Sequence, residues 1–117
     1  MNQPIYKILR NTEWQIASSV KDYTGSADDI RDGFIHFSTA KQLNSTLEKY
    51  FRGQEGVYIL AFEAKSFKNE ALKWEPSRGG ALFPHLYGTL DVRNAQRSWQ
   101  INVPSAASID LSFLKET

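Results

Sequence analysis

The strongest constraint on the fold is the run Val57-Tyr-Ile-Leu-Ala-Phe62, which is the most hydrophobic segment of the chain. It is continuous, short, and rich in β-branched and aromatic residues. A run of this kind is typical of a buried strand. We therefore expect residues 57–62 to form the central strand of a sheet.

Other segments supply partners for this strand. Alternation of apolar and polar residues, or a short apolar run bounded by turn residues, predicts strands at residues 5–9, 34–37, 67–74, 85–92 and 98–103. The segment Pro76–Gly80 must be a loop, because proline and paired glycines cannot continue a ladder.

Two main helices are predicted from capping-box patterns. Thr12 is followed three residues later by Gln15, and Thr39 is followed in the same way by Gln42. The second helix runs over roughly residues 40–51. A polar loop over residues 23–33, with a turn of helix at 27–31, is long enough to be functional. The predicted fold class is α+β, with a mixed, mostly antiparallel sheet of about five or six strands and two main helices.

Length and composition narrow the class of protein. A chain of 117 residues predicts a single domain, with an ordered core at about residues 4–103 and a loosely held C-terminal tail. The chain has no cysteine, and its net charge of +1 favours neither nucleic acid nor membrane as a partner. With no apolar signal segment or membrane span in the sequence, we expect a cytoplasmic protein.

Both histidines of the chain lie in predicted strands, in Phe34-Ile-His-Phe-Ser-Thr39 and Phe83-Pro-His-Leu-Tyr-Gly88. The period of two places His36 and Ser38 on one face, and His85 and Tyr87 on another. Such a face lines either a cleft or a core in which the imidazole is satisfied by a backbone carbonyl. The neighbouring glycines allow close backbone approach and favour the cleft.

Glu75 and Arg78 are the charged candidates, in Lys73-Trp-Glu-Pro-Ser-Arg-Gly-Gly80. A carboxylate beside an indole can have its ionisation perturbed by burial, as general acids and bases do. The alternative is an ordinary ion pair between Glu75 and Arg78. An arginine followed by two glycines is also typical of an anion-binding loop. The histidine and carboxylate spacing predicts no metal site.

These motifs, with Ile5-Tyr-Lys-Ile8 and Trp14, together resemble a bacterial family catalogued as a domain of unknown function, number 952. More distantly, the chain is similar to the ADP-ribosyltransferase superfamily, and especially to its tRNA 2′-phosphotransferase branch. Ile35-His-Phe-Ser38 resembles the His-x-Ser strand of those enzymes, and Glu75 corresponds by order to their late glutamate. The opening His-Gly-Thr motif is absent, and Tyr6-Lys7-Ile8 stands in its place.

The resemblance implies an ADP-ribosyltransferase-like fold with a nucleotide-binding cleft, and NAD as a candidate co-substrate. Whether the chain is an enzyme stays open. The alternatives are a non-catalytic module for a small molecule or a protein, and a phosphodiesterase that uses two histidines. The candidate catalytic residues are His36, Glu75 and His85. The candidate substrate-binding residues are Tyr6, Lys7, Ser38, Thr39, Arg78 and Tyr87.

Overall fold

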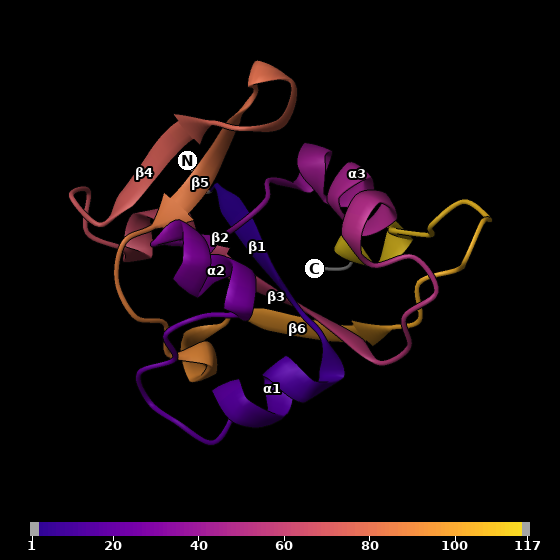
Figure 1. Cartoon of the computed structure of the whole chain (residues 1–117), viewed down its shortest axis with the longest axis horizontal. Coiled ribbons are helices and arrows are strands. Elements are labelled where there is room, and N and C mark those ends of the chain that lie inside the picture. The colour runs from indigo at the N-terminus through magenta and orange to yellow at the C-terminus, as the bar shows by residue number, and fades with distance from the viewer. Residues whose placement is uncertain (1–2, 116–117) are drawn as a thin grey trace.

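The strands of the protein form two antiparallel sheets (Figure 1). The computed structural model describes residues 3–115. One sheet has the order β1-β3-β6 and consists of β1 (Pro4–Leu9), β3 (Val57–Glu63) and β6 (Arg97–Ile101). The other has the order β2-β5-β4 and consists of β2 (Ile35–His36), β5 (Leu82–Leu86) and β4 (Leu72–Pro76).

The α+β class is confirmed, but the single mixed sheet that we predicted is replaced by these two sheets of three strands each. The division follows from the shortness of β2, which pairs with β5 over only Ile35 and His36. Two residues after His36, Ser38 pairs with β1 instead of β5. There the backbone N–H of Tyr6 donates to the carbonyl of Ser38 (2.8 Å), and that of Ser38 donates to the carbonyl of Tyr6 (2.9 Å).

Three α-helices accompany the sheets: α1 (Asn11–Ala17), α2 (Ala27–Asp32) and α3 (Ala40–Tyr50). The predicted box at the start of α3 is confirmed, because Thr39 and Gln42 exchange backbone and side-chain hydrogen bonds. The predicted box at Thr12 is wrong. The backbone N–H of Arg10 instead donates to Glu13, so the capping residue of α1 lies two positions earlier than expected.

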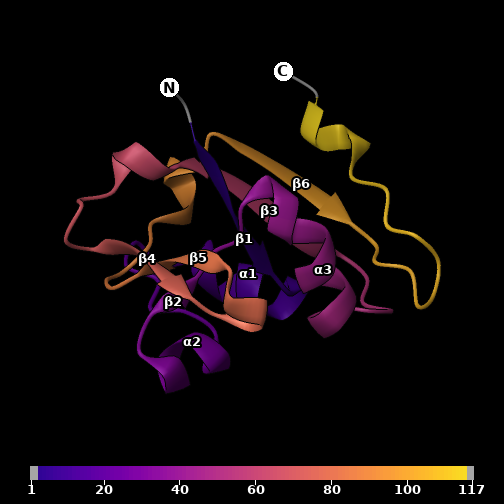
Figure 2. The same cartoon turned by 90° about the horizontal axis from the view of Figure 1, so that it is seen from above.

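The first sheet is covered on both faces, as expected for the apolar run in β3. On one face Ile5, Leu60 and Phe62 pack with α1 and residues of the second sheet. On the other face Ile59 packs with Leu43 of α3, and the C-terminal segment covers the same side (Figure 2). There the Trp99 and Phe113 ring centroids lie 5.1 Å apart.

Strand β5 differs from its prediction, since it spans Leu82–Leu86 rather than residues 85–92. Beyond Leu86 the chain leaves the sheet: Leu90 bridges to Tyr23, and Asp91 caps a 3-10 turn. Short 3-10 turns occupy Ala64–Ser66, Arg78–Gly80, Val92–Asn94 and Ser112–Lys115.

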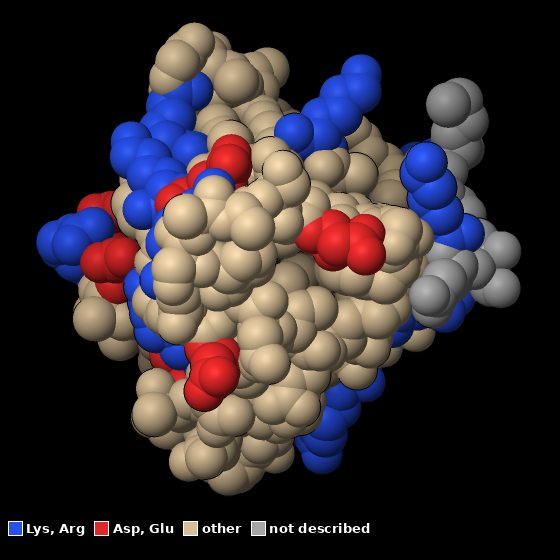
Figure 3. Space-filling view, turned by 90° about the vertical axis from the view of Figure 1, so that its right-hand side faces the viewer, with Lys and Arg blue, Asp and Glu red and all other residues tan. Residues whose placement is uncertain are grey.

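Most of the face covered by α3 and the C-terminal segment is uncharged, and many of its lysine and arginine side chains gather along one edge with acidic side chains among them (Figure 3). Within residues 3–115, no helix has the length and apolar character needed to cross a membrane.

Candidate functional site

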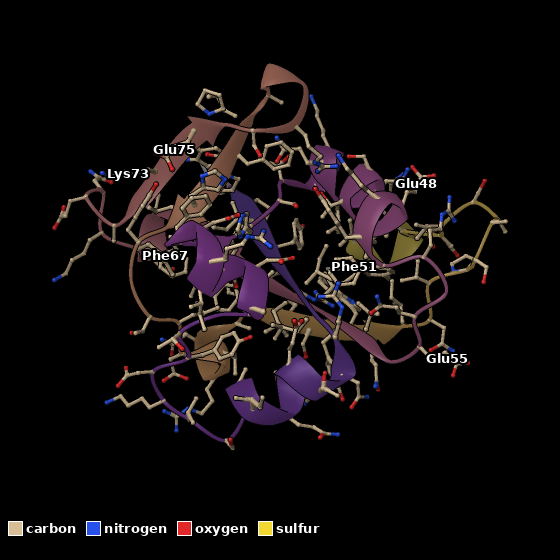
Figure 4. The ribbon with its side chains drawn as sticks, viewed as in Figure 1. Glu48, Phe51, Glu55, Phe67, Lys73 and Glu75 are labelled. Atoms are coloured by element: carbon tan, nitrogen blue, oxygen red, sulfur yellow. The ribbon has the colours of Figure 1, made fainter. Side chains whose placement is uncertain are left out.

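A pocket of about 220 Å³ lies where the two sheets meet, between α2, α3 and the loop that follows β4. Residues of β1 and β2 form part of its lining. The buried Phe51, at the end of α3, closes one side of it, whereas Glu48 stands on the outer side of that helix (Figure 4).

The register of the second sheet places the two histidines side by side. His36 of β2 pairs with His85 of β5, which in turn pairs with Lys73 of β4. The His36 and His85 ring centroids are 5.6 Å apart. Phe34 stacks on the His85 ring, with centroids 4.0 Å apart and planes 22° from parallel. Alternation therefore brings the predicted pair of imidazoles to one face of one sheet.

His85 is hydrogen-bonded to Glu75 of the neighbouring strand β4. Its Nδ1 lies 2.8 Å from Oε1 of Glu75, and the Tyr87 hydroxyl donates to the same oxygen at 2.7 Å (Figure 4 shows Glu75 on β4). The hydrogen bonds from Tyr87 and His85 hold the pKa of Glu75 below its usual value, and the bond to Glu75 raises the pKa of Tyr87. His85 is only 4% exposed, and its Nε2 has no hydrogen-bond partner among residues 3–115.

His36 has carboxylates at both ring nitrogens. Nδ1 lies 2.6 Å from Oδ1 of Asp29, and Nε2 lies 3.0 Å from Oδ2 of Asp32. Asp29 and Asp32 both belong to α2, so these contacts tie His36 to that helix at two points. The expectation of a core histidine bonded to a carbonyl therefore does not describe its ring.

Asp29 lies at the centre of a buried polar network and is 2% exposed. Its Oδ2 accepts from Lys7 Nζ (2.9 Å) and from the backbone N–H of Ser26 (2.9 Å). Burial alone would raise the pKa of Asp29. The hydrogen bond with His36 and the charge of Lys7 outweigh burial and hold the pKa well below the usual range. Gly25 fits closely beside it, with φ at +113° and room for no side chain.

Arg78 reaches the pocket from the loop after β4. Its Nη2 donates to Oγ1 of Thr46 (2.7 Å), which also lies 3.2 Å from the Ser38 hydroxyl. The guanidinium carbon lies 5.0 Å from the Phe83 ring centroid and 5.6 Å from that of Tyr50. The ion pair between Glu75 and Arg78 that the spacing allowed is not formed between these described residues.

The basic side chains that line the pocket differ in their partners. Lys7 is paired with Asp29, Arg10 with Glu13, and Arg31 with Asp28 and Asp32. Arg78 has no carboxylate partner within the part of the chain that the structure describes. Among the lysines and arginines of the lining, Arg78 is thus the one whose charge is not paired with a carboxylate of the described residues.

The predicted site residues fall into two groups. Tyr6, Lys7, His36, Ser38, Arg78 and His85 line the pocket. Glu75 and Tyr87 stand behind His85 rather than in the lining, and Thr39 caps α3. Lys7 is 4% exposed and pairs with Asp29, so its charge is used inside the protein to link β1 to α2.

Sequence reasoning missed Asp29, Asp32 and Thr46. Ser26-Ala-Asp-Asp29 has the spacing of a capping box, and the structure shows that box at α2. The pattern gave a signal for Asp29 as a helix cap but none for its contacts with Lys7 and His36. Thr46 had no local signal, since it reaches the pocket only through the packing of α3. Among residues 3–115, no group of three or more acidic or histidine side chains is placed to hold a metal ion.

Comparison with known proteins identifies relatives across almost the whole chain. The crystal structure of protein CC0527 from Caulobacter crescentus has a TM-score of 0.86 and 43% identity, covering 95% of this chain and 96% of that one. The solution NMR structure of CC0527 has a TM-score of 0.75 and 47% identity, covering 85% and 84%. Among curated proteins, none matches the chain. The sequence model described as "Protein of unknown function (DUF952)" matches residues 8–98. The chain therefore belongs to the DUF952 family.

Proposed function

We propose that this protein binds a nucleotide-like ligand in the pocket between its two sheets, with a phosphate group at Arg78. The observation that carries the proposal is the environment of Arg78, which lacks a carboxylate partner within residues 3–115 while Lys7 and Arg10 in the same lining have one. A guanidinium suits phosphate because its planar fork of N–H donors matches two phosphate oxygens.

Hydroxyl groups continue this polar end of the pocket. Ser38, Thr46 and Ser77 line the wall beside Arg78, and hydroxyls donate readily to phosphate and sugar oxygens. Tyr50 and Phe83 add aromatic rings next to the guanidinium, against which a base can stack. The wall thus offers a surface for each part of a nucleotide: phosphate, sugar and base.

The size of the pocket limits what it can enclose. Drug-sized ligands occupy pockets of roughly 300–1,000 Å³, and this one holds about 220 Å³. It therefore fits one sugar-phosphate unit, with the rest of the ligand outside. NAD is our candidate co-substrate on the strength of the ADP-ribosyltransferase resemblance. One sugar-phosphate half of NAD would enter the pocket, and a glycosyl or phosphate transfer is the reaction class that this placement favours.

Calorimetric titration with ADP-ribose tests the proposal. Arg78→Ala should weaken binding roughly ten- to hundredfold, the value of losing hydrogen bonds to a charged group. Arg78→Lys should restore part of this loss, because it keeps the charge but not the fork. Arg93→Ala is the matched control, since Arg93 pairs with Asp91 away from the pocket. Equal affinity of the Arg78→Ala variant and the wild type would reject the phosphate site.

A second candidate function is favoured by the histidine pair. Two imidazoles with ring centroids 5.6 Å apart can act as acid and base on a phosphodiester. In that case His85, whose Nε2 has no partner among residues 3–115, is the acceptor, and His36 is the donor. Hydrolysis of a 2′,3′-cyclic nucleotide with a bell-shaped pH profile, lost in both His36→Ala and His85→Ala, would establish this activity. Binding of ADP-ribose by a protein that does not hydrolyse the 2′,3′-cyclic nucleotide would exclude this activity.

A further inference from the structure

The hydrogen bonds behind His85 determine which ring nitrogen carries the proton. An ionised carboxylate oxygen can only accept, and Glu75 Oε1 lies 2.8 Å from His85 Nδ1. Nδ1 must therefore carry the proton of this bond. The lowered pKa of Glu75 agrees with a carboxylate that stays ionised. Tyr87 donates to the same oxygen and so holds the Glu75 side chain in the orientation that His85 needs.

The ring has little freedom to leave this arrangement. Phe34 stacks on one of its faces at 4.0 Å, and the residue is 4% exposed. Nδ1 is anchored to Glu75, which lies outside the pocket lining, whereas His85 itself is part of that lining. In the neutral ring Nε2 then bears a lone pair, and this buried nitrogen has no partner among residues 3–115. Buried polar atoms in native proteins are seldom left unpaired, so one without a partner requires an explanation.

The two histidines differ in this respect. In the free protein both nitrogens of His36 face carboxylates of α2. Nε2 of His85 faces none. Of the two rings in the lining, the one left with an unpaired nitrogen among residues 3–115 is therefore that of His85.

We propose that Glu75 and Tyr87 are positioning residues which keep the proton of His85 on Nδ1, so that Nε2 accepts a hydrogen bond from a hydroxyl group of the ligand. This inference rests on the proposed function, because it adds the hydroxyl contact to a ligand already bound through phosphate. Phosphate oxygens at neutral pH are acceptors and suit Arg78, whereas a lone pair on Nε2 requires a donor. The ligand class is thus a sugar phosphate, with its anion at Arg78 and a sugar hydroxyl at His85.

The first test reads the tautomer of the free protein from long-range nitrogen–proton spectra of the histidine rings. In the wild type we expect the His85 signals of a ring protonated on Nδ1 and unprotonated on Nε2. Glu75→Leu should abolish this preference, and Glu75→Gln should restore it in part, because the amide carbonyl can still accept. Glu55→Gln is the control, since Glu55 is exposed and far along the chain from β4. A wild-type Nε2 that carries a proton would overturn the assignment.

The second test uses AMP with its 2′-deoxy and 3′-deoxy analogues as probes. Removing the hydroxyl that meets Nε2 should weaken binding about three- to tenfold, the value of one neutral hydrogen bond. His85→Asn should cancel that difference, because its amide can keep the bond to Glu75 but leaves no acceptor in the place of Nε2. Equal affinity of AMP and both analogues for the wild type would mean that Nε2 meets only a water, and would overturn the hydroxyl contact.

The two proposals fail separately. If AMP, ADP-ribose and inorganic phosphate all fail to bind, the proposed function is wrong, whatever the tautomer. If they bind through Arg78 but the deoxy analogues bind as tightly as AMP, only the role of His85 is wrong.

Discussion

At the residue scale, the side chain that joins most of the pocket wall is Asp29, which links Lys7 on β1, His36 on β2 and the N-terminus of α2. Both members of the Lys7–Asp29 pair are buried, with side chains 5% and 1% exposed. Removing one member of such a pair leaves a buried charge without compensation, which is far more harmful than losing an exposed pair.

We predict that Asp29→Asn lowers the free energy of unfolding by about 3–5 kcal/mol, the range for breaking a buried ion pair. Asp28→Asn is the matched control, because Asp28 is the neighbouring aspartate and its side chain is 56% exposed. The control should stay within about 0.5 kcal/mol of the wild type. Urea denaturation with an unchanged m-value measures both, and a loss below about 1 kcal/mol for Asp29→Asn would contradict the network.

The same residue predicts a pH dependence. The pKa of Asp29 is well below its usual value in the folded protein, so the unfolded chain binds the proton more tightly. The stability that Asp29 contributes is therefore complete above its unfolded pKa of about 4 and is lost as the pH falls towards the folded pKa. Urea midpoints measured from neutral pH down to about pH 2 should fall in the acid range, and more steeply for the wild type than for Asp29→Asn. Parallel curves for the two proteins would show that Asp29 is not the group responsible.

The histidines and Arg78 could be proposed as site residues from the sequence because their signals are local: alternation along a strand, and glycines beside an arginine. It treated Lys7 as a ligand contact, whereas the structure buries Lys7 against Asp29. The partner is 22 positions away along the chain, and no periodicity connects a lysine in a strand with an aspartate at a helix cap. Pairings between distant segments are where a single sequence carries least information.

At the element scale, α3 begins with a complete capping box. Thr39 Oγ1 accepts from the backbone N–H of Gln42, and the Gln42 side chain accepts from the backbone N–H of Thr39. Leu43 and Leu47 then pack against the first sheet. The start of this helix was predictable because the capping box and the apolar stripe agree with one another.

We predict that Thr39→Ala lowers the free energy of unfolding by about 1 kcal/mol, the usual value of an N-cap hydroxyl. Ser45→Ala is a suitable control, since Ser45 is an exposed hydroxyl within the same helix, where alanine is the better helix former. Chemical denaturation distinguishes the two. If Thr39→Ala is as stable as Ser45→Ala, the cap contributes nothing to the start of α3.

The second sheet was harder to predict than α3. Strand β2 has two residues and β5 contains Pro84, so neither shows the long alternation that fixes strand limits. Pro84 still takes part in the pairing, because its carbonyl accepts from the N–H of Phe37. The limits of β5 depend on this pairing and on the bridge between Leu90 and Tyr23, both of which are contacts between distant segments.

At the scale of the whole molecule, the division into two sheets is what creates the pocket. A single flat sheet would place β2 directly beside β1, with their faces continuous. Instead the backbone bonds between Tyr6 and Ser38 join the two sheets at one point, and the pocket opens beside that point. The run at residues 57–62 was enough to predict the central strand of the first sheet. The separation of the second sheet was not predictable, because it depends on how short β2 is in the folded chain.

The measurement that tests the central claim most directly is an NMR titration of the isotope-labelled protein with ADP-ribose. The account predicts saturable shifts concentrated at Ser38, Thr46 and Arg78 and at the ring of His85, the residues that line the pocket. The face formed by Lys65, Phe67 and Trp74, which lines a separate pocket, should not respond. No shift at millimolar ADP-ribose, or shifts centred on that second face, would contradict a nucleotide site between the sheets.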